Sequence, residues 1–463
     1  MNHKLIALVA CSRNLGIGLN NSIPWNIKED RSFFCKTTTN NVVVMGSKTF
    51  QSLPNKLPLK NRINIVLSEK QSEVKKESDE LYFCNFNSLS TILGNISLEK
   101  KVFIIGGEQI YTLFEDKYDE ILLTYIDKSY KCDVFFPKIN NTYTISNYTK
   151  PYWNTTELCN FRFITYIKTN INVCDIEYLS LVKRVLDKSK DLRIDRTGTG
   201  TYSIFGEQIS FDISKFIPIL STKRVPWKSC IEELLWFMRG DTDANILREK
   251  GVNIWNLNST KEFQGKVGLG HLEEGDCGAN YSFQWRYCGQ EYKSCKSIYE
   301  KNTKYDQINN IINQLKTDPF SRRIFMSAWN PCDLDKTVLP PCHVSVQFYV
   351  DNNNNLSCHM YQRSCDVFLG LPWNILSYSI LTYILAKKCD LKPDRLIISF
   401  GDTHIYSNHI EQVKIQLQRS YLSPSILVVN DSVKNKNIED IEVSDFDIIG
   451  YLPHKSIQGD MSV

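Results

Sequence analysis

The sequence predicts two domains: an α/β domain with a central, mostly parallel sheet, joined by a short connector to a longer second domain. Its 463 residues exceed the usual size of one compact domain. Up to about residue 168, short apolar runs alternate with helical patterns. A polar segment follows, and a new helical periodicity begins after it. These three observations favour two folding units.

Four short runs rich in valine and isoleucine predict the strands of the first domain. Near-continuous apolar runs are typical of strands buried on both faces of a parallel sheet. The runs are NVVVMG (41–46), INIVLS (63–68), KVFIIGG (101–107) and EILLTYI (120–126). Helical patterns such as EQIYTLFEDKY (108–118) lie between them, which indicates an α/β arrangement.

The second domain begins after a polar stretch. TNINVCD (169–175) reads as the connector, and IEYLSLVKRVLDKSK (176–190) has the periodicity of a helix. The expected domains are therefore residues 1–168 and 176–463. Further along, VSVQFYV (344–350) alternates apolar and polar residues, as a strand with one buried face does, and NNNN (352–355) reads as a hairpin tip.

The composition limits which binding partners and which cellular compartment are expected. A net charge of +4 gives no strong attraction to nucleic acids or membranes. The fifteen cysteines are odd in number and form no CxxC pair, which argues against a disulfide framework and a zinc ribbon. We expect a cytoplasmic protein with reduced thiols.

Two apolar segments raise the alternative of a signal or a membrane span. In MNHKLIALVACS the apolar run has only six residues, against about 7–15 in a signal core, so a buried first strand is the better interpretation. VFLGLPWNILSYSILTYILA (367–386) has no charge, but Gly370 and Pro372 interrupt it and polar residues follow. We expect a loop followed by a buried core helix.

Several motifs of the first domain are ambiguous when taken alone. NLGIGLNNSIPW (14–25) contains GxG without the GxGxxG dinucleotide fingerprint. Asp30 lies beside two phenylalanines in KEDRSFFCK, where a carboxylate also favours a helix dipole. MGSKT (45–49) and IGGEQIY each follow a strand and lead toward a helix, where backbone amides can hold phosphates.

Together these motifs, with LKNRINIVLS, LLTYI and DVFFP, resemble dihydrofolate reductase over about residues 4–168. The resemblance implies that Asp30 binds the pterin and promotes its protonation, and that NADPH is the cofactor. The implied folate-binding residues are Asp30, Phe34, Arg62, Ile105 and Thr124. The implied cofactor-binding residues are Ala10, Gly16, Ile17, Gly18, Gly46, Ser47, Lys48, Thr49, Leu67, Ser68, Gly106, Gly107, Glu108, Gln109, Ile110 and Tyr111.

One residue departs from this family's pattern. After the final LS of LKNRINIVLS, the family often carries an arginine for the 2′-phosphate of NADPH, and this chain has Glu69. An acid there repels a phosphate, and Lys48 or Lys70 is expected to compensate.

In the second domain, four arginines flank one cysteine. They occur in RTGTGTYSIFG (196–206), SRR (321–323) and YQRSCDVF (361–368), and the cysteine lies in LPPCH, at the entrance of the predicted strand. The pattern suggests a phosphate ester held near a thiolate. A zinc site is the alternative, because Cys-His occurs at 342–343 and 358–359, but adjacent residues of a strand point to opposite faces.

These motifs, with STKRV, EELLWF, FQWR, LGLPWN and GDTHIYSNH, resemble thymidylate synthase over about residues 177–463. The resemblance implies an α+β domain in which Cys342 attacks the pyrimidine of dUMP and methylenetetrahydrofolate supplies the one-carbon unit. The implied catalytic residues are Cys342, Glu233 and Tyr281. The implied dUMP-binding residues are Arg196, Arg322, Arg323, His343, Gln362, Arg363, Ser364, Asp366, Asn374, His404 and Tyr406, with Asp366 also contacting the folate.

The synthase resemblance is weakest in DCGANYSFQWR (276–286). Cys277, Ala279, Asn280 and Ser282 replace the usual residues there, and Asn256 replaces a usual aspartate. These changes, with Glu69, motivate an alternative hypothesis of a folate-binding or scaffolding protein with one inactive half.

As a whole, the chain resembles the bifunctional dihydrofolate reductase–thymidylate synthases of protists and plants. This resemblance implies small-molecule substrates, a homodimer formed through the synthase domain, and arginines of SRR that serve the partner's site. It implies no metal, no membrane and no nucleic acid for catalysis.

Overall fold

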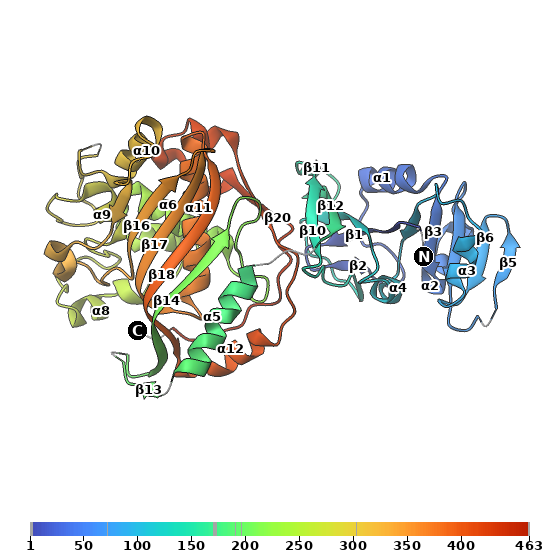
Figure 1. Ribbon diagram of the computed structural model, residues 1–463, viewed down its shortest axis with the longest axis horizontal. Helices are drawn as coiled ribbons and strands as arrows, with labels where there is room; N and C mark the ends of the chain where they lie inside the picture. Colours follow the sequence, from blue (N-terminus) through green and yellow to red (C-terminus); the bar gives the residue numbers. More distant parts are fainter. Residues whose placement is uncertain are drawn as a thin grey trace. The chain divides into compact units, whose positions relative to one another are not determined.

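The computed structural model describes residues 3–71, 73–169, 174–189, 191–195, 197–301 and 303–461. The chain divides into two compact units after residue 171 (Figure 1). We describe each unit by itself. Arg196 and most of the expected connector (170–173) lie outside the described residues.

The first unit is built on a sheet that has ten strands within the described residues, in the order β10-β12-β8-β1-β7-β3-β4-β6-β5, with β11 beside β12. Its central strands pair in parallel, and antiparallel strands flank them. The strands are β1 (Leu5–Ser12), β3 (Val42–Gly46), β4 (Ile63–Leu67), β5 (Lys75–Ser78), β6 (Leu81–Cys84), β7 (Val102–Ile104), β8 (Glu120–Ile126), β10 (Tyr143–Tyr148), β11 (Tyr152–Asn154) and β12 (Cys159–Lys168). The predicted α/β class with a mostly parallel central sheet is confirmed.

Short helices connect these strands. They are α1 (Lys28–Thr38), α2 (Ser47–Ser52), α3 (Leu89–Gly94) and α4 (Glu108–Leu113), and a small ribbon joins β2 (Gly16–Gly18) to β9 (Val134–Phe135). The helix expected over 108–118 ends at Leu113. The chain has to reverse before β8, and it turns so that both Phe114 and Tyr118 are buried.

The second unit contains a six-stranded sheet within its described part, in the order β13-β14-β18-β17-β16-β15. Among these described strands, only β17 and β18 pair in parallel. The strands are β13 (Leu192–Arg193), β14 (Thr201–Asp212), β15 (Phe325–Ser327), β16 (His343–Val350), β17 (Asn355–Asp366) and β18 (Lys392–Tyr406), and a separate ribbon holds β19 (Ile426–Val429) and β20 (Phe446–Ile449). The β16–β17 connection is the expected NNNN hairpin tip.

Helices and loops gather around this sheet, as the expected α+β class requires (Figure 1). The helices are α5 (Cys174–Lys188), α6 (Trp227–Arg239), α7 (Ala244–Glu249), α8 (Lys261–Lys266), α9 (Tyr281–Tyr287), α10 (Gln307–Thr317), α11 (Gly370–Lys388) and α12 (Ile410–Leu417). Among the helices of this unit, α6 and α11 carry the most buried side chains. They pack against each other, and α11 also packs on β17 and β18.

One expected helix boundary was wrong. Helix α5 begins at Cys174, within the expected connector, because the Asp175 side chain is buried and hydrogen-bonded to residues 221–222. Residues 367–369 form a turn and the buried helix α11 follows, so the expected loop and core helix are confirmed, although the helix begins at Gly370 and includes Pro372. A proline is tolerated in the first helical turn, where no intrahelical acceptor is needed for its nitrogen.

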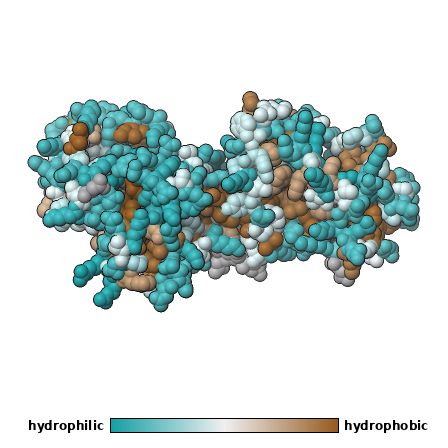
Figure 2. All heavy atoms as spheres, turned by 90° about the horizontal axis from the view of Figure 1, so that it is seen from above, coloured by the Kyte–Doolittle hydropathy of each residue, from teal (hydrophilic) through white to brown (hydrophobic). Residues whose placement is uncertain are grey.

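Among the helices that the structure describes, none is both long enough and apolar enough to cross a membrane. Leu5–Ala10 forms most of the buried strand β1, as expected. On the face seen in Figure 2, hydrophobic side chains lie in separate patches among hydrophilic ones.

Candidate active sites

The carboxyl ends of the parallel strands β3 and β7 bring two glycine-containing segments together in the first unit. Gly46 ends β3 and donates its backbone N–H to the carbonyl of Gly106, at 2.8 Å. Helices α2 and α4 begin directly afterwards, at Ser47 and Glu108. Two helix N-termini, whose first amides have no intrahelical partner, therefore lie next to each other.

The backbone at this place leaves no room for larger residues. A Cβ on Gly46 would lie 3.0 Å from Cγ1 of Ile110, and a Cβ on Gly106 would lie 2.9 Å from the ring of Tyr111. The Tyr111 hydroxyl donates to the carbonyl of Leu8 on β1, at 2.8 Å. This closely packed backbone at two helix N-termini fits a nucleotide cofactor whose phosphates need to approach the main chain.

The remaining cofactor candidates surround these strand ends. Gly16 belongs to the β2–β9 ribbon, where a Cβ would overlap the side chain of Cys132. Ser68 follows β4 and donates its N–H to the carbonyl of Cys84, and Glu69 beside it is exposed. The other candidates occupy the same segments: Ala10, Ile17, Gly18, Lys48, Thr49, Leu67, Gly107 and Gln109.

Asp30 lies in the first turn of α1, in a largely apolar setting. Burial raises the pKa of its carboxyl group, and the nearby Thr124 hydroxyl and the Arg31 charge oppose that shift. The hydroxyl of Thr124 and the indole nitrogen of Trp25 are buried and have no hydrogen-bond partner of good geometry among the described residues. A hydroxyl beside a carboxyl of raised pKa, with an unpaired indole N–H near the same helix, suits a polar ligand that receives a proton.

The other folate candidates line the same helix and sheet. Phe34 and Ile105 are half-buried and pack against the apolar cluster above β1, β3 and β7. Arg62 donates from Nη2 to the carbonyl of Cys35, at 3.0 Å, and from Nε to the hydroxyl of Thr38, also at 3.0 Å. The Arg62 guanidinium thereby lies at the end of α1.

In the second unit, Cys342 lies at the entrance of β16, as expected. Its backbone N–H donates to the hydroxyl oxygen of Tyr281, at 2.6 Å. The guanidinium of Arg363, on the neighbouring strand β17, lies 3.9 Å from the Cys342 sulfur. A cation at this distance favours the thiolate, which is the nucleophilic form.

Carbonyl groups of the Pro-Pro-Cys segment hold Arg363 in place. Its Nε donates to the carbonyl of Pro341 at 2.8 Å, and Nη2 donates to that of Pro340 at 2.7 Å. Its guanidinium also lies over the ring of Trp329. The two prolines therefore orient the arginine as well as the cysteine.

Three candidates for nucleotide recognition follow on β17 and α11. Gln362 is buried and donates to Oδ1 of Asn374 at 3.1 Å, while its own Oε1 has no partner among the described residues. Asp366 ends β17 and accepts the backbone N–H of Phe368. The unpaired oxygen of Gln362 leaves an acceptor for a ligand.

The ribose candidates lie at the end of β18. His404 is buried and pairs with Asp402 at 2.8 Å, and this bond holds the pKa of Asp402 below its usual range. The ring of Tyr406 contacts that of His404. Asp402 was not predicted as a site residue, although GDTHIYSNH contains it.

His343 is a buried, neutral ring. Burial lowers its pKa to about 3. It stacks on Tyr281 with centroids 4.0 Å apart, and Nδ1 bonds the Tyr378 hydroxyl at 2.8 Å. Tyr281 itself is buried with a pKa raised well above the usual value, so its hydroxyl stays protonated at neutral pH.

Glu233 is a buried carboxyl on α6. Burial raises its pKa to about 7, and hydrogen bonds from the indoles of Trp255 (2.8 Å) and Trp373 (2.6 Å) oppose the shift. A group that titrates near neutral pH can both accept and release a proton. Sequence reasoning predicted Glu233 but not its two indole donors, although Trp373 lies in the LPWN motif.

The remaining arginines occupy different places. Arg322 and Arg323 are both exposed, just before β15. The carbonyl of Arg322 accepts a hydrogen bond from Gln347 on β16, at 3.1 Å. Ser364 follows Arg363 on β17, and Arg196 lies outside the described residues.

The unusual stretch 276–286 forms an ordered helix start. Asn280 is the N-cap of α9, and its side chain accepts the N–H of Ser282 at 3.1 Å. Asparagine is a favourable N-cap, which explains why this residue is compatible with the helix start. Helix α9 thereby still delivers Tyr281 to Cys342.

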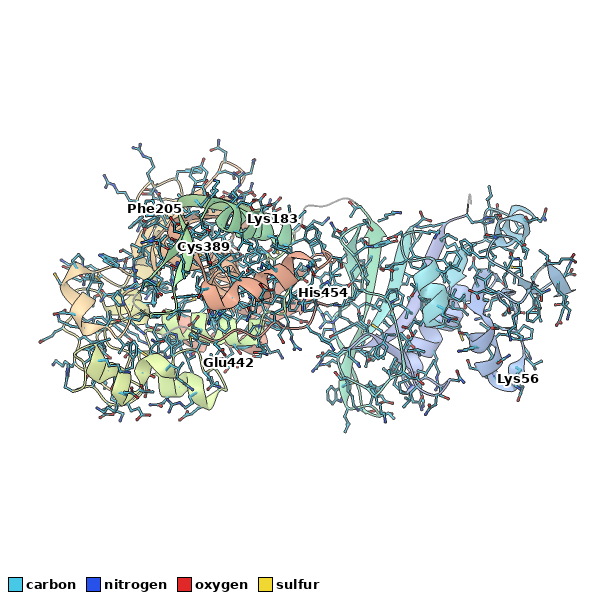
Figure 3. The ribbon with its side chains drawn as sticks, turned by 90° about the horizontal axis from the view of Figure 1, so that it is seen from below. Lys56, Lys183, Phe205, Cys389, Glu442 and His454 are labelled. Carbon is cyan, nitrogen blue, oxygen red and sulfur yellow. The ribbon has the colours of Figure 1, made fainter. Side chains whose placement is uncertain are left out.

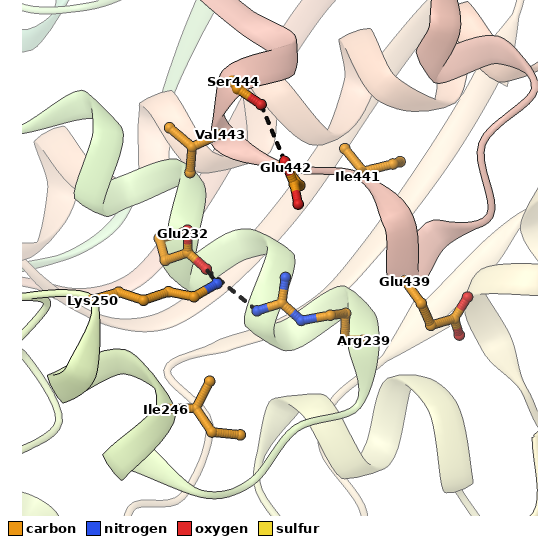
Figure 4. A pocket seen from close by; sticks show the side chains of 9 residues that line it. All are labelled: Glu232, Arg239, Ile246, Lys250, Glu439, Ile441, Glu442, Val443 and Ser444. Atoms are coloured by element: carbon orange, nitrogen blue, oxygen red, sulfur yellow. Dashed lines mark hydrogen bonds and ion pairs between the residues drawn. The ribbon is translucent and has the colours of Figure 1, made fainter.

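A separate pocket of about 430 Å³ lies beside α6 (Figure 4). Glu232, which lines it, accepts hydrogen bonds from Lys250 and, at 3.4 Å, from Arg239. None of the candidate site residues lines this pocket. It is therefore distinct from both candidate active sites.

The strand geometry also bears on the zinc alternative. On β17, Cys358 is buried and His359 is exposed, so the two side chains point to opposite faces as predicted. Within the described ranges, no group of three or more His, Cys, Asp or Glu side chains could hold a metal ion.

The fold and the two candidate sites are those of a two-unit enzyme, with a candidate nucleotide-cofactor site on a largely parallel sheet and a thiol–arginine pair on a mixed one. The family model for dihydrofolate reductase matches residues 4–168, and that for thymidylate synthase matches residues 176–463. The chain is 40% identical to the bifunctional dihydrofolate reductase-thymidylate synthase of Paramecium tetraurelia over all of this chain and 99% of the relative. Proteins of the same name from Zea mays and Leishmania major are 37% and 36% identical, over 98% of this chain and 96% and 94% of theirs. The chain belongs to the bifunctional dihydrofolate reductase–thymidylate synthase family.

Proposed function

We propose that this chain catalyses two linked reactions: methylation of dUMP to dTMP by methylenetetrahydrofolate, and NADPH-dependent reduction of dihydrofolate to tetrahydrofolate. We assign the reductase to residues 1–168 and the synthase to residues 176–463, with the connector between them. The observation that carries the proposal is the Arg363 guanidinium beside the Cys342 sulfur, in a chain whose other unit holds a half-buried Asp30 of raised pKa. The two reactions are complementary, because the synthase produces the dihydrofolate that the reductase consumes.

In the synthase, Cys342 is the nucleophile. Its thiolate adds to the pyrimidine ring of dUMP and forms a carbon–sulfur bond, while the ring electrons move to an enolate that bonds the one-carbon unit of the folate. Arg363 lies beside both the sulfur and the proposed phosphate position. The other dUMP-binding residues in this proposal are Arg196, Arg322, Arg323, His343, Gln362, Ser364, Asp366, Asn374, His404 and Tyr406.

Proton transfer in the synthase is assigned to Glu233 and Tyr281. The pKa of Glu233 near 7 lets the carboxyl group exchange protons at neutral pH through bound water. The Tyr281 hydroxyl is protonated and accepts the Cys342 N–H, so its own proton is directed to another acceptor in the site.

In the reductase, bound NADPH would supply the hydride. Asp30 promotes protonation of the pterin ring, since its raised pKa keeps a proton available, and the Thr124 hydroxyl orients the ring edge. Phe34 and Ile105 pack on the folate, and Arg62 pairs with its carboxylate. The backbone around Gly46 and Gly106 holds the cofactor's phosphates.

We further propose a homodimer formed through the outward face of the synthase sheet. Phe325, Tyr349 and Tyr361 are 50%, 65% and 42% exposed on three adjacent strands. In the sheet, Phe325 is paired with Gln347, and Gln347 is paired with His359. Paired residues of neighbouring strands point to the same face, so these three side chains share the face that points away from the core. Phe205 of β14, labelled in Figure 3, is 83% exposed. Exposed aromatic side chains on one sheet face suit burial against a second copy.

The position of Arg322 supports a shared synthase site. Its carbonyl contacts Gln347 on this outward face. Arg322 and Arg323 therefore lie where a second copy would dock, and each chain would lend them to the phosphate in the partner's site.

Separate inactivation of the two units tests the proposed function. Cys342→Ser should abolish dTMP formation, because a neutral hydroxyl does not replace a thiolate without its own base, and should leave dihydrofolate reduction intact. Asp30→Asn should do the reverse. Near-normal synthase turnover by Cys342→Ser would refute the nucleophile assignment.

A further inference from the structure

The buried carboxylate of Glu233 is held by two indoles from distant parts of the chain. Trp255 donates to Oε1 at 2.8 Å, and Trp373 donates to Oε2 at 2.6 Å. Each oxygen therefore has its own N–H donor. The pair fixes the plane of the carboxylate as well as its position.

Trp373 is attached to α6 at two points. Besides the indole bond to Glu233, its carbonyl accepts a hydrogen bond from the thiol of Cys230, at 3.4 Å. Cys230 and Glu233 are one turn apart on α6, so the first turn of α11 is joined to one face of that helix. The next residue, Asn374, accepts from Gln362.

The groups around Glu233 carry no charge at neutral pH. Cys230 on α6 and Tyr378 on α11 both have pKa values raised well above the usual ones by burial, so both stay protonated. Beyond them, His343 on β16 is neutral and Tyr281 on α9 is protonated. Among the described residues, the two indoles are thus the groups that oppose the effect of burial on this carboxyl.

We propose that Trp373 is a positioning residue of the synthase. It orients Glu233 through its indole N–H and joins Glu233 to the start of α11, where Asn374 lies. The proposal rests on the role assigned above to Glu233. Because Trp373 and Asn374 are consecutive residues, the Glu233 carboxylate and the proposed dUMP-binding amide of Asn374 are both held by the start of α11.

The chemical consequence is a change in the proton affinity of Glu233. An N–H donor stabilises the ionised carboxylate more than the neutral acid. Removing one of two donors from a buried carboxyl should raise its titration midpoint by about one pH unit. Whichever form of Glu233 is active, the limb of the pH profile that reports it moves to higher pH.

The variant Trp373→Phe keeps an aromatic ring and removes the N–H. We would measure kcat/KM for dUMP from pH 5 to 9 and follow Glu233 itself by infrared difference spectra of the carboxyl group, with Glu233→Gln as the blank. The expected result is a midpoint about one unit higher by both methods. Trp255→Phe should shift it in the same direction. Dihydrofolate reduction by the same chain serves as the internal standard for enzyme concentration.

Trp236→Phe is the matched control. Trp236 is a buried tryptophan on α6, and its indole donates to the Asp243 carbonyl at 3.0 Å instead of to Glu233. It should lower stability without moving the midpoint. If Trp373→Phe fails to fold, benzothienylalanine at position 373 keeps the indole shape and lacks the N–H.

The outcomes separate the inference from the function on which it rests. If Glu233→Gln retains normal synthase activity, the role of Glu233 is wrong and the inference fails with it. If Glu233→Gln is inactive but the infrared midpoint of the folded Trp373 variant equals that of the wild type, the inference alone is overturned. A shift shared by Trp236→Phe would equally overturn it, because any lost indole would then suffice.

Discussion

Asp175 is expected to stabilise the synthase unit strongly, although it lies next to the connector. It is 1% exposed in the first turn of α5. Its carboxylate accepts the backbone N–H and hydroxyl of Ser221 and the backbone N–H and hydroxyl of Thr222, at 2.5–2.9 Å. These bonds join the first helix of the unit to the segment that precedes α6.

Asp175→Asn removes half of this set without changing the side chain's size. The amide oxygen can still accept two of the four donors, while the amide nitrogen faces the other two. A hydroxyl can rotate away, but one backbone N–H stays buried and unpaired, at a cost of about 1–3 kcal/mol. The surviving bonds lose their charge assistance as well. We therefore expect a loss of about 3 kcal/mol in the free energy of unfolding of this unit.

Residual activity in urea measures the effect on each unit separately. With a denaturant slope of about 3 kcal/mol per molar, the midpoint for loss of dTMP formation should fall by about 1 M, while that for dihydrofolate reduction should not change. Asp187→Asn, an exposed position on the same helix, is the control and should shift neither midpoint. Equal midpoints for Asp175→Asn and the wild type would refute the reasoning.

Three further predictions concern the two sites and the assembly. Burial raises the pKa of Asp30, so its ionisation opposes folding above the unfolded pKa of about 4; Asp30→Asn should raise the melting temperature at pH 7 but not near pH 3, and an equal gain at both would be inconsistent with this cause. Glu69→Arg should lower KM for NADPH and leave that for NADH nearly unchanged, whereas an unchanged NADPH constant would place Glu69 outside the 2′-phosphate pocket. Refolding an inactive Cys342 variant with the double variant Arg322→Ala, Arg323→Ala should restore up to about one working synthase site per mixed dimer; if mixed dimers form but stay inactive, the shared site is wrong.

Local sequence patterns predicted the parts of the fold that depend on nearest neighbours. The apolar runs at 41–46 and 120–126 became β3 and β8, because strands covered on both faces need continuous apolar side chains. The alternation at 344–350 became β16, because a strand with one buried face needs an apolar side chain at every second position. The helix expected over 108–118 failed where the chain had to turn back toward β8, since periodicity does not report a reversal.

Contacts between distant residues decided what the sequence could not predict. Glu233 and Trp373 are 140 positions apart, and no local pattern predicts their hydrogen bond. The early start of α5 depends on Asp175 reaching residues 221–222. Arg286 of the FQWR motif is buried and paired with Asp306 at 3.1 Å, 20 positions away. In each case the partner is fixed by tertiary packing.

The stoichiometry of the combined reaction tests the central claim most directly. The wild-type protein would receive dUMP, methylenetetrahydrofolate and NADPH, and both dTMP formation and NADPH loss would be followed. Because each dTMP releases one dihydrofolate, we expect about one NADPH oxidised per dTMP formed. Asp30→Asn should form dTMP without NADPH loss. Cys342→Ser should show neither, and added dihydrofolate should restore NADPH oxidation without dTMP formation. Formation of dTMP by the wild type without NADPH oxidation, or no dTMP at all, would contradict the account.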